Sequence, residues 1–235
     1  YVYIGCFLFN HEDPAMRFIR RFNLTTNQWG PVGQGLDWKV ETLAVAANGD
    51  IYAGGSFTGG LARFDGTQWT EVGGGVSGVV RDIAFAPNGT LYVGGQFDQV
   101  GSQLANNVAS WDGTVWNTLD GGIIGGGGVN GVFGMSIGAN GKVYIGGDFD
   151  LADSDLSHLN KAAVWDGSGK WKPMGSGLGN SSSQIVNTVF ADGNDIYMGG
   201  VFADPLGPPN RKKNFARWNE SLDLSGSGEP AEPAR

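Results

Sequence analysis

The stretch Ile51-Tyr52-Ala53-Gly54-Gly55-Ser56-Phe57 decides the fold, because the chain repeats it along most of its length. Five of the six tyrosines occupy the position of Tyr52. The copies lie at residues 2–7, 51–57, 91–97, 143–149 and 196–202, and their tyrosines follow one another after 49, 40, 52 and 53 residues. A repeat of this period indicates an array of small, similar structural units.

The second copy shows the unit most clearly. Residues 42–45 form an apolar run that ends at Asn48-Gly49, just before the Tyr-Gly-Gly strand. Because Asn-Gly favours positive φ angles, the two runs predict a hairpin with a two-residue turn. Residues 61–64 predict a third strand that ends on an aromatic residue, and Asp65 behind it is typical of a turn capped by its own side chain. Trp69 opens a fourth strand.

Composition supports this interpretation. The chain has 42 glycines and 9 prolines in 235 residues and only 16% charged residues, which excludes a helical bundle. Hydrophobic residues make up 40%, enough to build a core. Units of four strands without a helical period predict an all-β fold, a β-propeller of about five four-stranded blades. A glycine doublet such as Gly54-Gly55, which has no Cβ atoms, would let the next blade approach closely.

The first and last blades are predicted to be incomplete within this chain. We count four first strands, five second strands, five third strands and four clear fourth strands. The first blade lacks its inner strand, and the last has only residues 221–224 as a weak outer candidate. Because unpaired strand edges are a liability, we expect that the chain is a segment of a longer protein, or that a flanking domain or neighbouring subunit donates a strand.

The unit x-Tyr-x-Gly-Gly-x-Phe, followed by Ala-x-Trp-Asp-Gly and a further Trp, resembles kelch-like repeats of secreted and surface β-propellers. It is more closely similar to delta-60-type repeats of bacterial extracellular proteins and to repeats of fungal cortical polarity markers. The resemblance extends to about Trp218 and implies a propeller over residues 1–225, outside the cell or at its surface. Cys6 and Leu222 depart from the pattern. Residues 226–235 have the composition of a Gly/Ser/Pro/Glu linker.

Charge limits the partners. The 15 basic and 23 acidic residues give a net charge of −8, which argues against nucleic acid as a partner. No apolar run is long enough for a membrane-spanning helix, so direct membrane insertion is not expected. Nucleophile motifs are absent, and the single Cys6 has no basic neighbour, so no catalytic residue is predicted.

The candidate ligand-binding residues lie in connectors and loops. Trp38 fits no repeated position, whereas the other seven tryptophans occupy strand positions that favour packing between blades over sugar stacking. His11 and Asp13 lie between the second and third strands of the first unit, and His158 and Asp153 lie in the same loop of the fourth. Such loops share one face of a propeller, and we predict that these five residues contact the ligand. The alternative for the loop residues is a solvated surface.

One weak metal site is predicted. Asp148, Asp150, Asp153 and Asp155 concentrate the hard oxygen ligands that calcium prefers. The stretch lacks the central glycine and terminal glutamate of an EF-hand, and no histidine pair has zinc-binding spacing. Calcium is therefore the one cofactor suggested, and otherwise none is expected.

These observations predict a non-catalytic extracellular or cell-surface scaffold that recognises a protein or glycan through variable loops on one face. One alternative is a structural subunit of a homopolymeric surface assembly. The other is a polysaccharide-active hydrolase or lyase with carboxylates in a central funnel, because folding can pair carboxylates that are distant in sequence.

Overall fold

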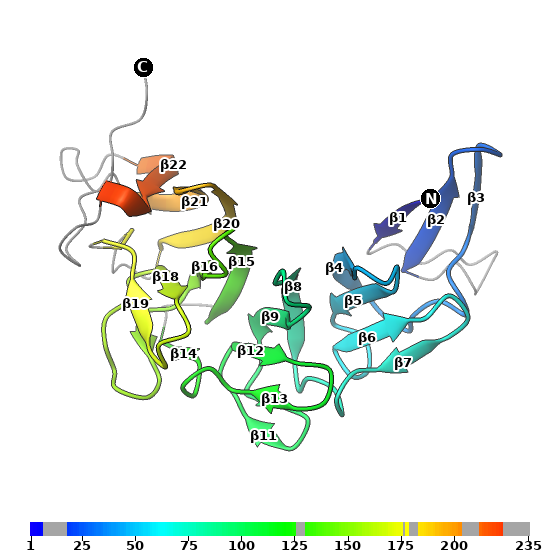
Figure 1. Cartoon of the computed structure of the whole chain (residues 1–235), viewed down its shortest axis with the longest axis horizontal. Helices are drawn as coiled ribbons and strands as arrows, with labels where there is room; N and C mark the ends of the chain where they lie inside the picture. Colours follow the sequence, from blue (N-terminus) through cyan, green and yellow to red (C-terminus); the bar gives the residue numbers. More distant parts are fainter. Residues whose placement is uncertain (7–17, 126–129, 176, 179–182, 204–211, 223–235) are drawn as a thin grey trace.

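A computed structural model describes residues 1–6, 18–125, 130–175, 177–178, 183–203 and 212–222. These residues form five antiparallel sheets of three or four strands, which follow one another along an arc (Figure 1). They contain one short 3-10 helix, η2 (Glu220–Leu222), and no α-helix. No helix in this part of the chain has the length and apolar character needed to span a membrane.

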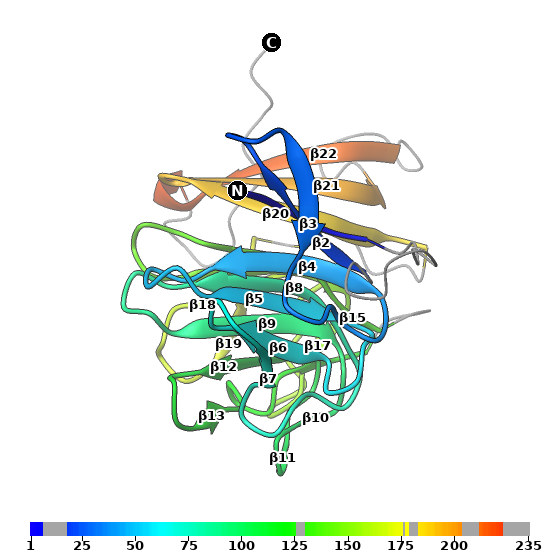
Figure 2. The same cartoon turned by 90° about the vertical axis from the view of Figure 1, so that its right-hand side faces the viewer.

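Each sheet is a meander in chain order, as the second sheet shows in Figure 2. The first sheet contains β1 (Val2–Gly5), β2 (Ile19–Asn23) and β3 (Gln28–Pro31). The second contains β4 (Val40–Val45), β5 (Ile51–Gly55), β6 (Leu61–Phe64) and β7 (Trp69–Glu71), and the third contains β8 (Val79–Phe85), β9 (Leu91–Gln96), β12 (Val108–Trp111) and β13 (Trp116–Asn117). The fourth contains β15 (Gly131–Ile137), β16 (Val143–Asp148), β18 (Ala162–Trp165) and β19 (Trp171–Pro173), and the fifth contains β20 (Ile185–Asp192), β21 (Asp195–Ala203) and β22 (Lys212–Asn219).

The predicted strand inventory is confirmed within the described residues. The first sheet has no strand on the inner side of β1, and the last has none beyond β22. Two short pairs lie outside the five sheets: β10 (Gln99–Val100) with β11 (Gln103–Leu104), and β14 (Ile123–Ile124) with β17 (Leu151–Ala152).

The first glycine of the doublet permits close contact between neighbouring sheets in the second, third and fourth sheets, as expected. A Cβ atom added to Gly54 would lie 2.5 Å from Cγ1 of Val80, which belongs to the inner strand of the next sheet. Gly94 faces Val132 in the same way, at 2.6 Å. The second glycine lies against the backbone of its own inner strand, so each doublet serves two different close contacts.

The tryptophans at the start of the fourth strands donate hydrogen bonds to the connector that follows the preceding sheet. The indole Nε1 of Trp69 donates to the carbonyl of Val32 at 2.9 Å, and Trp116 donates to Gly73 at 2.9 Å. Trp171 donates to the carbonyl of Leu119 at 3.0 Å. Trp29 has no preceding sheet among the described residues and is 48% exposed, so its position in the repeat does not by itself bury it.

The turns confirm one prediction and correct another. Oδ1 of Asp65 accepts hydrogen bonds from the backbone N–H groups of Thr67 and Gln68, which is the expected cap. The Asn-Gly hairpins are not two-residue turns, because Gly49 has φ of 90° and donates to the Ala46 carbonyl, whereas Asn48 is not in the left-handed region. Because the Ala46 N–H also donates to the Asp50 carbonyl, a three-residue loop, 47–49, joins β4 and β5. The Asn48 side chain accepts the N–H of the residue two positions on.

Candidate functional site

The variable loops and the connectors between sheets lie at one face of the molecule, here called the loop face. It comprises connectors 32–39, 72–78 and 119–124 and loops 56–60, 97–107 and 149–161. Val79 at the start of an inner strand pairs with Gln96 at the end of the second strand, so the connector entering a sheet and the loop leaving its second strand share one edge. Direct contacts join them, including the β14–β17 pair.

Trp38 lies on this face and is 54% exposed. Its ring packs against Phe18 with centroids 5.6 Å apart. The neighbouring Asp37 accepts hydrogen bonds from the N–H and hydroxyl of Thr58, which lower the pKa of that carboxyl group. An exposed aromatic is therefore attached to a connector that is bound to loop 56–60.

A hollow of about 200 Å³ lies on the other side of loop 56–60. Its walls come from the connector of the third sheet and from two loops, and it is lined by Gly59, Glu71, Gly74, Gly75, Val76, Ser77, Gln99 and Gly101. The Glu71 carboxylate reaches close to Gly59, where an added Cβ would lie 2.5 Å from Oε2. This arrangement places one exposed carboxylate over a glycine backbone.

A row of β-bulges shapes the inner strands at the same end. The pairing of each inner strand shifts by one residue, and the extra residues are Glu41, Arg81, Phe133 and Asn187. Arg81 Nη1 lies 3.2 Å from Glu41 Oε1, and its guanidinium lies 5.9 Å from the centroid of the Phe133 ring. Lys39 pairs with the same carboxylate at 2.7 Å. The sequence did not predict that these bulge residues lie together. Their one signal in the sequence is that the four bulge positions vary between units while the flanking residues repeat.

Asp82, next to Arg81, connects three inner strands. Its carboxylate accepts hydrogen bonds from the Met135 N–H at 2.8 Å and from the Thr42 hydroxyl at 3.3 Å. Burial raises the pKa of Asp82 in spite of these bonds. The residue therefore stabilises the arrangement of neighbouring sheets and is not free to bind a ligand.

The predicted loop residues do not form one cluster. His11 and Asp13 lie outside the described residues. His158 is exposed, and its backbone bridges to Leu151. Asp153 is half-buried, and its N–H donates to the Gly122 carbonyl at 3.1 Å.

The four candidate calcium ligands do not converge on one point: two pair with one lysine, a third pairs with another lysine, and Asp153 lies apart in the loop. Nζ of Lys161 is fully buried and lies 2.9 Å from Asp148 and 2.8 Å from Asp150. Asp155 pairs instead with Lys170, which lowers the pKa of that carboxyl to about 2. Within the described part of the chain, no three His, Cys, Asp or Glu residues gather as metal ligands. The calcium site stays a prediction, and an ammonium group occupies the place between two of its proposed ligands.

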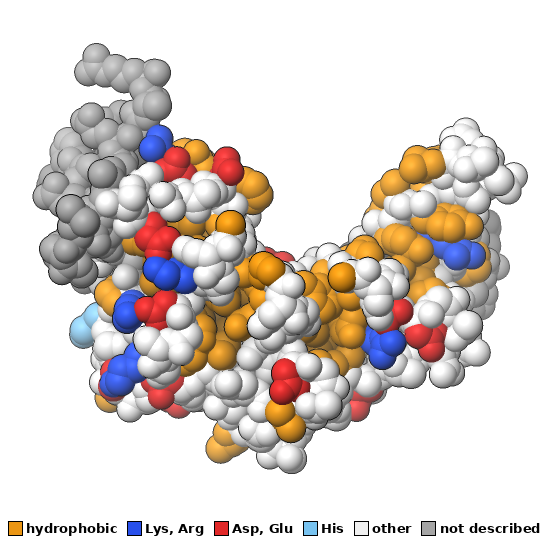
Figure 3. Space-filling model, viewed as in Figure 1, with side chains coloured by type: hydrophobic (Ala, Val, Ile, Leu, Met, Phe, Trp, Pro, Cys, Tyr) orange, Lys and Arg blue, Asp and Glu red, His pale blue; other side chains and the backbone are white. Residues whose placement is uncertain are grey.

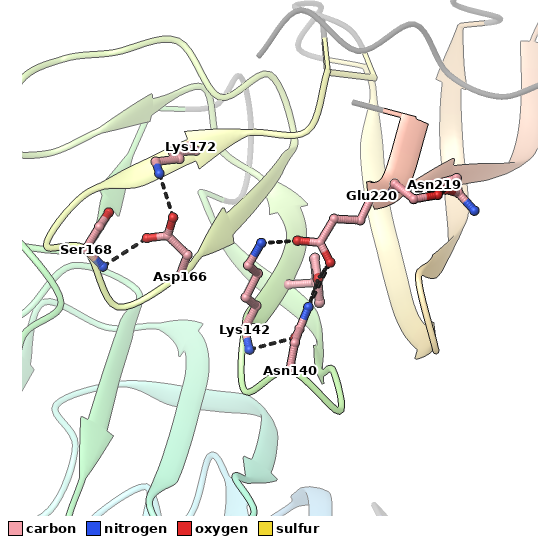
Figure 4. Close-up of polar contacts among 9 residues, drawn as sticks. Asn140, Lys142, Asp166, Ser168, Lys172, Asn219 and Glu220 are labelled. Atoms are coloured by element: carbon pink, nitrogen blue, oxygen red, sulfur yellow. Dashed lines mark hydrogen bonds and ion pairs between the residues drawn. The ribbon is translucent and has the colours of Figure 1, made fainter. Parts of the chain in front are cut away.

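Glu220 forms a polar connection between the last two sheets that the sequence did not predict (Figure 4). Its carboxylate binds Lys142, accepts from the Asn140 amide at 2.7 Å, and lies 3.0 Å from the Tyr144 hydroxyl. Burial, together with Glu220, raises the pKa of Tyr144 to about 12. Because Tyr144 is fully buried and Glu220 follows the last strand, the cluster stabilises the junction between the fourth and fifth sheets.

Known proteins resemble the chain in structure. No family model and no curated protein matches it. The extracellular domain of BT3049 from B. thetaiotaomicron is similar over 83% of this chain, at 16% identity and a TM-score of 0.52. PorZ, a surface component of the type-IX secretion system of Porphyromonas gingivalis, is similar over 82%, at 13% identity and a TM-score of 0.48. The chain spans 28% and 27% of the length of these two proteins, and the likeness to the BT3049 domain is one of fold.

Proposed function

We propose that the five sheets are blades of a β-propeller, and that the chain is an extracellular or cell-surface scaffold that binds a protein or glycan through its loop face without turnover. The observation that carries this proposal is Trp38, an exposed aromatic on a connector bound to the adjacent loop. Aromatic rings held in this way supply large contact area at low entropic cost.

The hollow beside loop 56–60 complements Trp38. An exposed indole face can stack on a sugar ring or an apolar side chain, whereas Glu71 accepts hydrogen bonds from hydroxyl or amino groups. Thr58, bound to Asp37, and Gly59, which lines the hollow, are adjacent in the chain. The two features therefore flank one short loop, where a single ligand can contact both.

Recognition is favoured over turnover by the state of the carboxylates at the inner strands. Glu41 is paired with Lys39 and Arg81, and Asp82 is mostly buried with its oxygens occupied by hydrogen bonds. Glycoside hydrolysis needs two carboxyl groups that reach the scissile bond. Neither of these groups is free to do so.

A glycan array combined with a polysaccharide turnover screen tests the proposal. Trp38→Ala is expected to weaken binding at least about tenfold, whereas Trp29→Ala, which removes another half-exposed tryptophan, leaves it unchanged. Equal loss in both variants would contradict a site at Trp38. Release of reducing ends that is abolished by Glu41→Gln, a change on the inner strand β4, would favour the hydrolase or lyase alternative.

A further inference from the structure

The four junctions between neighbouring sheets share one pattern. The glycine two residues after the repeated tyrosine receives a valine from the inner strand of the next sheet, in the pairs Gly5–Val40, Gly54–Val80, Gly94–Val132 and Gly146–Val186. Directly across from each glycine, the third strand places an apolar residue on the same face: Ile19, Leu61, Val108 and Ala162. All four of these side chains are fully buried.

The last sheet presents the same positions without the covering valine. Gly199 pairs with Phe215, as Gly54 pairs with Leu61. Among the described residues, a Cβ added to Gly199 would meet Thr188 Cγ2 of the same sheet at 3.0 Å and the Asn214 carbonyl at 3.8 Å, and no side chain of another sheet. Phe215, at the position buried in every other sheet, is 54% exposed.

Neighbouring side chains extend this apolar surface. Tyr197 stacks on Phe215 with ring centroids 5.9 Å apart. Phe190 pairs across from Tyr197 and is 61% exposed, and the equivalent Ala44 packs against the core between the second and third sheets. Hydrophobic side chains are visible over this sheet at the upper left of Figure 3. We call Phe190, Tyr197, Gly199 and Phe215 the open junction face.

We propose that the open junction face docks a further sheet of the same repeat, whose inner strand places a β-branched residue over Gly199. The surface continues an interface that the molecule builds four times, and the pattern of those interfaces specifies the occupant. The first sheet of a second copy does not fit, because its described residues contain no strand on the inner side of β1 and therefore no covering valine.

The test adds such a sheet to the full chain. A second copy of residues 72–118, which carries Val80, is fused after Arg235, and amide hydrogen exchange is measured in β21 and β22. The expected result is exchange at least about tenfold slower around Phe215, with β5 and β9 unchanged as an internal control of folding. The matched control fuses the same segment with Val80→Asp, and it should give no added protection.

Two results would overturn the proposal. One is equal exchange around Phe215 with and without the fused sheet, while the original sheets stay protected. The other is association of the unextended chain with increasing concentration that protects Phe190 and Phe215, since the occupant would then be a second copy.

Gly199→Ile in the extended chain should restore fast exchange, because the added side chain fills the place of the docked residue.

Discussion

The junction between the second and third sheets and the open junction face of the last sheet use equivalent positions in opposite states. Leu61 is fully buried, whereas Phe215 is more exposed than buried. Gly54 is covered by Val80, whereas no side chain from another sheet covers Gly199 in the part of the chain that the structure describes. The difference shows that each sheet presents positions that a following sheet can cover. The burial of a side chain at these positions therefore depends on the neighbouring sheet and not on the residue alone.

The largest contrast is expected at the third-strand position. Leu61→Ala removes a fully buried side chain and should lower the free energy of unfolding by about 3 kcal/mol. Phe215→Ala should cost less than about 1 kcal/mol, because much of this ring already contacts water. Urea unfolding of both variants measures the difference, and similar losses would contradict the contrast.

Adding a methyl group sharpens the comparison. Gly54→Ala places a Cβ 2.5 Å from Val80 Cγ1 and should destabilise the fold by about 2 kcal/mol. Gly199→Ala should change stability by less than about 0.5 kcal/mol, because the exposed Thr188 side chain can move. Thermal unfolding of the two variants checks this, and a larger loss at Gly199 would show that its face is already covered.

The tryptophan hydrogen bonds give a smaller contrast. Trp116→Phe loses the bond to the Gly73 carbonyl and should cost about 1 kcal/mol beyond the matching change Trp29→Phe. Chemical denaturation measures both. Equal effects would mean that the indole N–H does not contribute to the junction.

The smallest effects concern pH. The hydroxyl of Thr67 and two backbone N–H groups lower the pKa of Asp65 to about 2, so this group stabilises the fold above pH 4 and loses that effect as pH falls toward 2. Asp82 contributes to the pH dependence of stability with the opposite sign. Burial raises the pKa of this carboxyl group, so its protonation in acid stabilises the fold. Asp65→Asn should flatten the loss of stability between pH 4 and pH 2. Asp82→Asn should remove a gain in stability that the native protein shows above pH 4, as pH falls through the raised pKa of Asp82. Unfolding midpoints measured from neutral pH down to pH 2 test both signs.

The sequence predicted the fold from positions that recur. The glycines, the tryptophans of the fourth strands and the turn-capping Asp65 stand at fixed places in the unit, and their roles follow from general chemistry. The bulges were missed, because their one signal is that the extra residue varies between units while its neighbours repeat, and such variation does not by itself indicate a shift in pairing. The turn at Asn48-Gly49 was misassigned for a similar reason, since two turn types accept the same dipeptide.

The candidate site was less predictable, because its residues vary between units. Trp38 was found as the tryptophan that fits no repeated position; its side chain is exposed, and its contact with a ligand stays a prediction. Glu41 and Arg81 were missed, because their pairing requires the spatial proximity of two inner strands. Lys161 was missed because no sequence signal places its ammonium between Asp148 and Asp150.

A double-mutant cycle on Gly54 and Val80 tests the central claim most directly. If sheets pack by inserting the valine over the glycine, Val80→Ala removes Cγ1, the atom nearest to the methyl group of Gly54→Ala, and leaves the contact of that methyl group with Thr42 Cγ2 at 2.8 Å. The double variant should then be more stable than the sum of the single changes predicts, by about 1 kcal/mol or more. Strict additivity of the two free-energy changes would contradict this packing and the account built on it.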